Sequence, residues 1–434
     1  MEIKKLIYFM LFAVAGCCTF SLSAMAASYH PVDETFVKQA EELGVSQSVW
    51  DQAEYSAVSL PSAYKFTRHY RISHTSADSN TPSVKPQQWS RTKPLDLSKL
   101  KGLDADGEHD LIVLLRDRLK NHTMVVLKDG QLVHQHFFNG MDQNSTHLDM
   151  SISKSFTSAL ASIAVSEGKL DMSKKIEYYL PQFKGTAFEG STIQEVADMR
   201  SGLDIPTPKH KSWDPNFTLS QEWNGKNDSG LHGIKDYLVL IKNRKYPTGE
   251  AYQYQDPNTE LLGMIVEKAT GKKLSDYLEE KIWQQVGAEN DAYWMADPDG
   301  FVVASGGLNM TTRDLARIGQ LILNHGKNYL GTQIIPKSFL DALWEGNEAV
   351  RSAWKKYKEV GISPEGWYKD QYRVLNIRGH KILVMVGIHG QILVMEKSSG
   401  VVIAMNGGYP QTETPRMVNL AFFQIIPAIL DALK

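Results

Sequence analysis

Residues 149–172 read DMSISKSFTSALASIAVSEGKLDM and mark the point where a strand-rich segment gives way to a helix. From Ser151 onward, apolar residues recur at helical spacing and share one face: Phe156, Leu160, Ile163 and Ala164. Gly168 follows as the predicted C-cap. Ser151 and Lys154 stand three residues apart in the first turn of this helix, so their side chains share one face.

This Ser-x-x-Lys pair is a candidate nucleophile with its activating amine. The helix N-terminus and burial are both expected to lower the pKa of Lys154, and a neutral amine could take the serine proton. The backbone N–H of Ser151 could donate to an oxyanion. The spacing alone is unspecific, because it occurs six times in the chain. The alternative is a serine that caps the helix beside a solvated lysine.

Strand patterns lie on both sides of this helix. Upstream, residues 123–128 and 131–138 flank Asp129-Gly130, which favours a tight hairpin. Four downstream runs are typical of strands: 372–377, 381–388, 391–396 and 401–406. Helical patterns cover 110–118, 258–270, 275–286, 311–324 and 417–433. We therefore predict an α+β fold, with one antiparallel sheet formed from both chain ends, flanked by helices, and an inserted, mostly helical lobe over about residues 170–370.

The composition excludes several classes of function. With 47 basic and 49 acidic residues among 434, the formal charge is −2, so we expect no nucleic-acid partner. The two cysteines, Cys17 and Cys18, both lie in the first apolar stretch, so no disulfide or thiolate site is expected in the body of the protein. No His-Glu-x-x-His motif occurs, and we expect no metal. We assign His134 and His136 to the polar face of a strand.

The N-terminus has the pattern of an export signal. Lys4 and Lys5 precede a long apolar run, and small residues predict cleavage after Ala26, so residues 1–26 are interpreted as a signal peptide and the protein as periplasmic or secreted. A lipid anchor at Cys17 and a retained membrane helix are the alternatives. After residue 27 no apolar run reaches the ~20 residues of a membrane span. Residues 27–105 are interpreted as an N-terminal extension and linker, and residues 106–434 as the main domain.

Two further motifs lie downstream of the Ser-x-x-Lys pair. Tyr254-Gln255-Asp256 precedes the helix at 258–270, and Met385-Val386-Gly387-Ile388-His389 stands at a strand end. With the strings at 149–172, 191–204, 252–283, 305–326 and 387–406, the chain resembles the serine β-lactamase and penicillin-binding-protein superfamily. The resemblance is to its class-C-like branch of esterases and 6-aminohexanoate-dimer hydrolases, and it covers about residues 110–430.

The resemblance implies roles for individual residues. Ser151 is the acylated nucleophile, Lys154 its activating partner, and Tyr254 the group that relays protons to the leaving group. The backbone N–H groups of Ser151 and Ile388 form the oxyanion hole. Because the pKa of a free tyrosine is near ~10, Tyr254 would need a nearby cation such as Lys154 to act as a base.

The chain departs from the β-lactamase pattern at two places. Asp256 stands where those enzymes have asparagine, and Met385-Val386-Gly387 replaces their Lys-Thr-Gly. The groups that would hold a β-lactam carboxylate are therefore missing, and an uncompensated Asp256 should disfavour anionic substrates. Asp256 could instead cap the helix that follows it.

We expect a serine hydrolase that cleaves a small-molecule ester or amide through an acyl-serine, without cofactors. A β-lactamase or D,D-peptidase, and a non-catalytic binding protein, are the alternatives. Candidate substrate-binding residues are Asp256, Gly387, His389, Trp213 and Trp223. Tyr252 and Trp294 are further candidates for the pocket wall, and the loop at 204–235 is a candidate lid.

Overall fold

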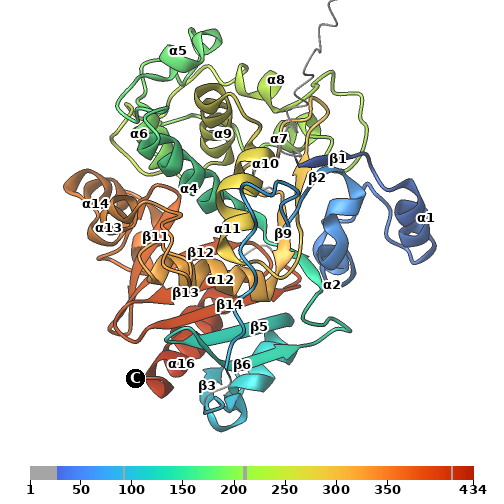
Figure 1. The fold of residues 1–434 in the computed structure, drawn as a ribbon. Coiled ribbons are helices and arrows are strands. Elements are labelled where there is room, and N and C mark those ends of the chain that lie inside the picture. The colour runs from blue at the N-terminus through green and yellow to red at the C-terminus, as the bar shows by residue number, and fades with distance from the viewer. Residues whose placement is uncertain (1–26, 91–92, 209–212, 412–413) are drawn as a thin grey trace, which may run out of the picture.

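The computed structural model describes residues 27–90, 93–208, 213–411 and 414–434. The predicted signal peptide, residues 1–26, and with it Cys17 lie outside the described residues. Within them, no helix is both long enough and apolar enough to cross a membrane. Figure 1 shows a sheet at the bottom of the view and a mostly helical region at the top.

A seven-stranded antiparallel sheet is built from both parts of the chain. Its strands follow the order β10 (Trp367–Lys369), β11 (Tyr372–Ile377), β12 (His380–Gly387), β13 (Gln391–Glu396), β14 (Val401–Gly407), β5 (Asn121–Lys128) and β6 (Gln131–Phe137). The late strand β14 pairs with the early strand β5, with Val402 opposite Leu127. The prediction of one sheet formed from both ends is confirmed.

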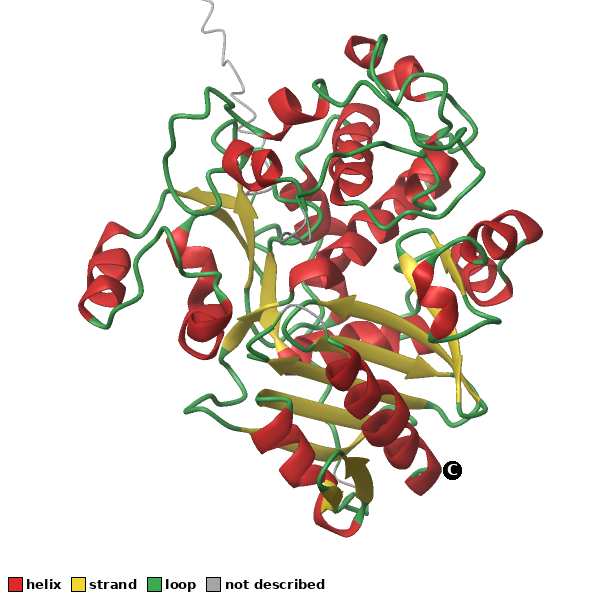
Figure 2. Ribbon diagram, turned by 180° about the vertical axis from the view of Figure 1, so that it is seen from behind, coloured by secondary structure: helices red, strands yellow, loops and turns green. Residues whose placement is uncertain are grey.

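Alternation along each strand sends apolar side chains into two separate cores. On β14, Val402 and Ala404 belong to one core and Val401, Ile403 and Met405 to the other. The first core is shared with α12 (Thr312–Leu323), and the second with the C-terminal helices α15 (Pro415–Val418), η9 (Asn419–Ile425) and α16 (Ile426–Ala432). Figure 2 shows the C-terminal helix lying across one face of the sheet. The sheet is therefore buried on both faces.

A second sheet was not predicted. It has the order β1 (Ser28–His30), β2 (Arg68–Ile72), β8 (Ala292–Ala296), β9 (Leu308–Thr311) and β7 (Thr146–Leu148). These strands have three to five residues each and come from distant parts of the chain, so no local sequence pattern predicts them. Through β1 and β2, the N-terminal extension pairs directly with the main domain.

The helical region is centred on two long helices that contact each other, α4 (Ser153–Ser166) and α9 (Asp256–Thr270). Gly271 ends α9 in the left-handed conformation, with φ 70°, and Gly287 ends the predicted 275–286 segment in the same way. Around α4 and α9 lie the shorter helices α5 (Ile176–Tyr179), α6 (Ile193–Ala197), α7 (Pro215–Ser220), α8 (Ile234–Leu238), α10 (Leu274–Leu278) and α11 (Gln284–Val286).

The remaining elements lie at the periphery. In the extension they are α1 (Glu34–Glu42) and α2 (Ser56–Ser59), followed by the hairpin β3 (Lys101–Asp104) and β4 (Gly107–Asp110) and the helix α3 (Leu111–Val113). Before β10 the chain forms α13 (Lys337–Glu345) and α14 (Glu348–Trp354).

Candidate active site

Ser151 lies on the short 3-10 turn η5 (Met150–Ile152), directly before α4. The turn is held by Asp149, whose buried carboxyl accepts hydrogen bonds from the Met310 backbone N–H at 3.1 Å and from Asn406 Nδ2 at 2.9 Å. Burial raises the pKa of Asp149 well above its usual range. Met150, directly before Ser151, takes a positive φ of 50°, a strained conformation for a residue with a side chain.

Lys154 is the centre of the site. Its Nζ lies 2.8 Å from Ser151 Oγ, 2.7 Å from the Ser305 carbonyl oxygen and 2.5 Å from Asp256 Oδ1. An ammonium has three N–H donors, and these three acceptors can engage all of them. The Lys154 side chain is only 2% exposed, so water contributes little. The geometry therefore fits a charged Lys154 that donates to the Ser151 hydroxyl.

The expected lowering of the Lys154 pKa is wrong. Burial does lower the pKa of Lys154, but the negative charge of Asp256 and the hydroxyl of Tyr254 outweigh it, and the pKa is raised above its usual value. Burial and the helix N-terminus are the only influences on this pKa that the local sequence indicates. The contact of the Asp256 carboxylate with the amine joins α4 to the start of α9, so no local pattern predicts it.

Tyr254 is flanked by two cations. Lys154 Nζ lies 5.0 Å from the centre of its ring and the Arg373 guanidinium carbon 4.5 Å. Arg373 is held by Glu359 through two hydrogen bonds, of 2.8 and 3.0 Å. Arg373 was missed in the sequence, where a single arginine in a strand run carries no signal. Two cations therefore lie within 5.0 Å of the centre of the Tyr254 ring.

Glu260 is a second residue that sequence reasoning missed. From α9 its two carboxyl oxygens accept hydrogen bonds, each 3.0 Å long, from the backbone N–H groups of Ala304 and Ser305. Burial raises the pKa of Glu260 to about 8. The bonds fix the backbone at Ser305, whose carbonyl accepts from Lys154, so Glu260 positions the amine without touching it.

At Gly387, the end of β12 lies against the turn that carries Ser151. A side chain there would place its Cβ 2.4 Å from the Asp149 carbonyl oxygen, so only glycine allows this approach. The following Ile388 lines the same cavity as Ser151. Met385 points away from the site and packs in the core with Phe156 and Tyr372.

His389 is a neutral side chain at the edge of the site. Its Nδ1 donates to the Tyr409 carbonyl oxygen at 2.8 Å, and burial lowers the pKa of the ring. The ring therefore presents no positive charge at neutral pH. His134 and His136 lie far from this region on β6, bonded to each other at 2.9 Å, and no metal-binding group of three or more His, Cys, Asp or Glu side chains occurs in the described residues.

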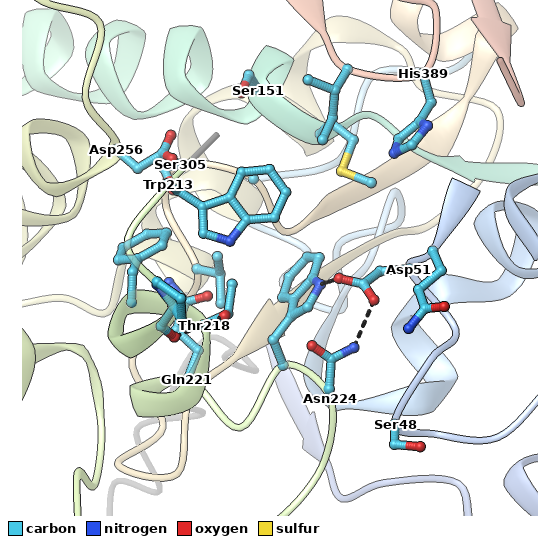
Figure 3. A pocket seen from close by; sticks show the side chains of 18 residues that line it. Ser48, Asp51, Ser151, Trp213, Thr218, Gln221, Asn224, Asp256, Ser305 and His389 are labelled. Atoms are coloured by element: carbon cyan, nitrogen blue, oxygen red, sulfur yellow. Dashed lines mark hydrogen bonds between the residues drawn. The ribbon is translucent and has the colours of Figure 1, made fainter. Parts of the chain in front are cut away.

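A cavity of about 510 Å³ opens over Ser151. One wall carries Ser151, Asp256, Ser305, Ile388 and His389, the second carries Trp213, Phe217, Trp223 and Asn224, and the third carries Ser48, Asp51 and Gln52 of the N-terminal extension. Figure 3 shows Ser151 and Asp51 on separate walls. A smaller cavity of about 180 Å³ adjoins Tyr254 and shares Trp213, Phe217 and Asp256 with the first.

Two proposed wall residues do not reach this space. Trp294 is fully buried and donates its indole N–H to the Val303 carbonyl oxygen at 2.9 Å. Tyr252 packs between the rings of Trp354 and Tyr368. The segment 204–235, predicted as a lid, contains α7, and α7 contributes Phe217 and Thr218 to the wall.

Comparison with known proteins places this geometry in context. A family model described as "Beta-lactamase" matches residues 115–421. The 6-aminohexanoate-dimer hydrolase of Paenarthrobacter ureafaciens is 28% identical over 297 residues, which are 67% of this chain and 73% of that protein.

Two solved structures have a fold similar to that of this chain. The structure titled as a putative 6-aminohexanoate-dimer hydrolase from Bacillus anthracis superposes with a TM-score of 0.76 and 25% identity, covering 90% of this chain and 97% of that one. A family VIII carboxylesterase shares the fold, with a TM-score of 0.55 at 14% identity, over 74% of this chain and 95% of that one.

Proposed function

The chain belongs to the beta-lactamase family, a hydrolase family with amidase and esterase relatives, and from this premise we propose that it is an exported serine hydrolase acting through an acyl-Ser151 intermediate. The observation that carries the proposal is the contact of Lys154 Nζ with Ser151 Oγ at 2.8 Å, inside a cavity of about 510 Å³. A serine hydroxyl held against a buried cation and open to a cavity is arranged for nucleophilic attack.

In the acylation step, Tyr254 enters as a phenolate beside the Lys154 ammonium; Ser151 Oγ attacks the substrate carbonyl carbon, and the serine proton passes to the phenolate oxygen. Lys154 serves as a cation, because its raised pKa keeps it protonated, and it stabilises negative charge on both oxygens. The carbonyl oxygen becomes an oxyanion, for which the backbone N–H groups of Ser151 and Ile388 are the donors.

Collapse of the tetrahedral intermediate breaks the ester C–O or amide C–N bond. Tyr254 returns its proton to the leaving alcohol or amine, and the acyl group stays on Ser151 Oγ. The same groups then act on water: Tyr254 accepts a proton from it, the hydroxide adds to the acyl carbon, and Ser151 leaves with the proton. Only water is consumed beyond the substrate.

Esters and linear amides are the proposed substrate class. The apolar Met385 leaves the site without the lysine that would bind a β-lactam carboxylate, and it is buried in the core. Asp256 forms an ion pair with Lys154 instead of capping α9, whose N-cap is Gln255. Its charge is therefore compensated, and our expectation that Asp256 alone would repel anionic substrates no longer holds.

A fluorophosphonate probe tests the acyl-serine mechanism. We expect one covalent adduct per chain by intact-mass spectrometry, on the peptide that contains Ser151. A folded protein that forms no adduct would favour a binding protein over an enzyme. Turnover of nitrocefin at a rate comparable to that of p-nitrophenyl acetate would favour a β-lactamase instead.

Export is tested separately by N-terminal sequencing of protein from the periplasm or medium of an expressing Gram-negative host. We expect the mature chain to begin at Ala27 without lipid. Metabolic labelling with palmitate, or processing blocked by globomycin, would assign the anchor to Cys17.

A further inference from the structure

A cavity of about 220 Å³ lies apart from the active site and shares no lining residue with the two cavities described there. Three parts of the chain form most of it: residues 87–89 of the N-terminal extension, the turn between β5 and β6, and the end of α12 with the loop that follows. Nothing in the chemistry proposed for Ser151 uses this space.

The wall that the extension contributes is fixed against α12. Arg317 Nη1 donates to the Gln87 carbonyl oxygen at 3.1 Å. The guanidinium carbons of Arg313 and Arg317 lie 4.6 and 4.3 Å from the centre of the Trp89 ring. Figure 1 shows this segment in blue, descending from the helical region toward the sheet. The wall is therefore in place before a ligand arrives, which lowers the entropy lost on binding.

Side-chain carboxamides are the main polar groups of this cavity. Those of Gln87, Gln320, Asn324 and Asn328 line it. Asn328 is engaged by the protein, since its Nδ2 donates to the Gln285 carbonyl oxygen at 2.9 Å. The carboxamides of Gln87 and Gln320 have no hydrogen-bond partner among the described residues, and Gln320 Oε1 is buried. Because a carboxamide both donates and accepts, these two groups suit a ligand that does the same.

Two aromatic rings supply apolar surface beside the carboxamides. Tyr329 is 42% exposed, and its hydroxyl donates to the Lys85 carbonyl oxygen at 2.9 Å, which fixes the ring at the cavity. Trp89 lines the same space, and its indole N–H has no partner among the residues that the structure describes. Each ring combines a flat apolar body with a polar atom at one edge.

The charged residues of the cavity carry no strong excess of one sign. The Asp129 carboxylate lies 3.5 Å from Lys128 Nζ, and the Arg317 guanidinium is paired with Glu289. Lys327 is exposed, so water and salt screen its charge. An acidic and a basic group on the same wall disfavour a strongly charged ligand of either sign, so the lining fits a neutral one.

We propose that this cavity binds a neutral sugar unit of an oligosaccharide or polysaccharide. Sugar hydroxyls donate and accept, as the carboxamides of Gln87 and Gln320 do, and the C–H faces of a sugar ring are apolar, as the rings of Trp89 and Tyr329 are. The proposal goes beyond the proposed function, because a ligand in this cavity does not contact Ser151. The site would attach the enzyme to a carbohydrate and leave the active site open.

The test is isothermal titration calorimetry of the folded chain with three uncharged probes: cellotetraose, maltotetraose and the tetramer of N-acetylglucosamine. We expect at least one of them to bind with a Kd of about 1 mM or lower. Ser151→Ala should bind it with the same Kd, and the saturating sugar should leave the hydrolysis of p-nitrophenyl acetate unchanged. Failure of all three probes to bind at about 10 mM would overturn the proposal.

Substitutions in neighbouring glutamines assign the binding to this cavity. Gln87→Ala and Gln320→Ala should each raise the Kd about fivefold, the effect of losing about one hydrogen bond. Trp89→Ala should raise it about tenfold or more, because the ring surface is lost as well. Gln88→Ala is the matched control, since Gln88 is exposed, follows Gln87 directly and does not line the cavity. Its Kd should equal that of the wild type.

Salt separates a neutral ligand from a charged one. The Kd of the sugar should change less than about twofold between 0.05 and 0.5 M NaCl, because no ion pair forms on binding. Inorganic phosphate that binds more tightly than every sugar, and more weakly as salt rises, would assign the cavity to an anion and overturn the proposal. Sugar binding that is unchanged in both Gln87→Ala and Gln320→Ala would overturn it too. Absence of a fluorophosphonate adduct would instead count against the proposed function alone.

Discussion

The charged side chains at the two ends of the main cavity differ in their partners. At the catalytic end, Lys154 is surrounded by three acceptors and its partner Asp256 is 2.5 Å away. At the end formed by the extension, Asp51 has only the neutral donors Trp223 and Asn224. The buried Lys154 thus has a carboxylate partner, whereas Asp51 forms no ion pair with any described residue.

This difference separates chemistry from recognition. A catalytic group must hold one protonation state before the substrate arrives, so its partners come from the protein. A recognition group gains most when its best partner is the ligand itself. Four substitutions can break or sharpen this contrast, beginning with the largest expected effect.

Removing the nucleophile should abolish reaction at the catalytic end and leave the fold unchanged. Ser151→Ala is expected to lower kcat at least about 1,000-fold and to eliminate the fluorophosphonate adduct. The free energy of unfolding should change by less than about 1 kcal/mol, because alanine suits the first turn of a helix. Chemical denaturation measures the second quantity. Retained turnover would mean that another residue is the nucleophile.

A side chain at Gly387 should push the end of β12 away from the nucleophile turn. Gly387→Ala places a Cβ 2.4 Å from the Asp149 carbonyl oxygen, so the backbone at Ile388 must shift. We expect kcat to fall about 100-fold, as when an oxyanion donor is lost. Gly361→Ala is the matched control, because a Cβ there meets no atom within 4 Å. Equal activity of the two variants would argue against an oxyanion role for Ile388.

Breaking the ion pair at the catalytic end should change the pH profile. In Asp256→Asn the burial of Lys154 is no longer opposed by the Asp256 carboxylate, so the pKa of Lys154 should fall. If the ammonium is the active form, activity is lost as pH rises through this pKa, and the alkaline limb of kcat/KM moves to lower pH. Glu250→Gln, which breaks an exposed pair with Lys356, should leave that limb in place. An unmoved limb in Asp256→Asn would contradict the role of Lys154 as a cation.

The smallest effect is expected from the support of Asp51. Trp50→Phe removes the hydrogen bond to the Trp223 carbonyl and should lower the free energy of unfolding by about 1 kcal/mol. It should also raise KM for p-nitrophenyl esters whose acyl chains reach the wall formed by Ser48, Asp51 and Gln52, because the segment loses its anchor. Trp294→Phe removes a similar bond, to the Val303 carbonyl, and should cost about as much stability while leaving KM unchanged. Equal KM values in the two variants would show that Trp50 does not position Asp51.

Much of the fold is readable in local patterns. The Asp129-Gly130 hairpin, the four C-terminal strands and the helix ends at Gly271 and Gly287 follow from turn residues and periodicity, and all appear in the structure. The joining of strands from both chain ends in one sheet was also predicted, whereas the pairing of β14 with β5 is known only from the structure. The sheet of β1, β2, β7, β8 and β9 was not, since its strands are short and pair across long separations in the chain.

The features of the site also fall into two groups, those that the sequence predicts and those that only the tertiary structure reveals. The order Ser151, Lys154, Tyr254 is visible in the primary structure, since the first two share a helical turn and the third begins a recognisable motif. The charge state of Lys154, the guanidinium beside Tyr254 and the presence of Asp51 on the cavity wall are not, because each depends on residues far apart in the chain meeting in space. Electrostatic energies depend on distance and burial, and packing of the whole chain sets both.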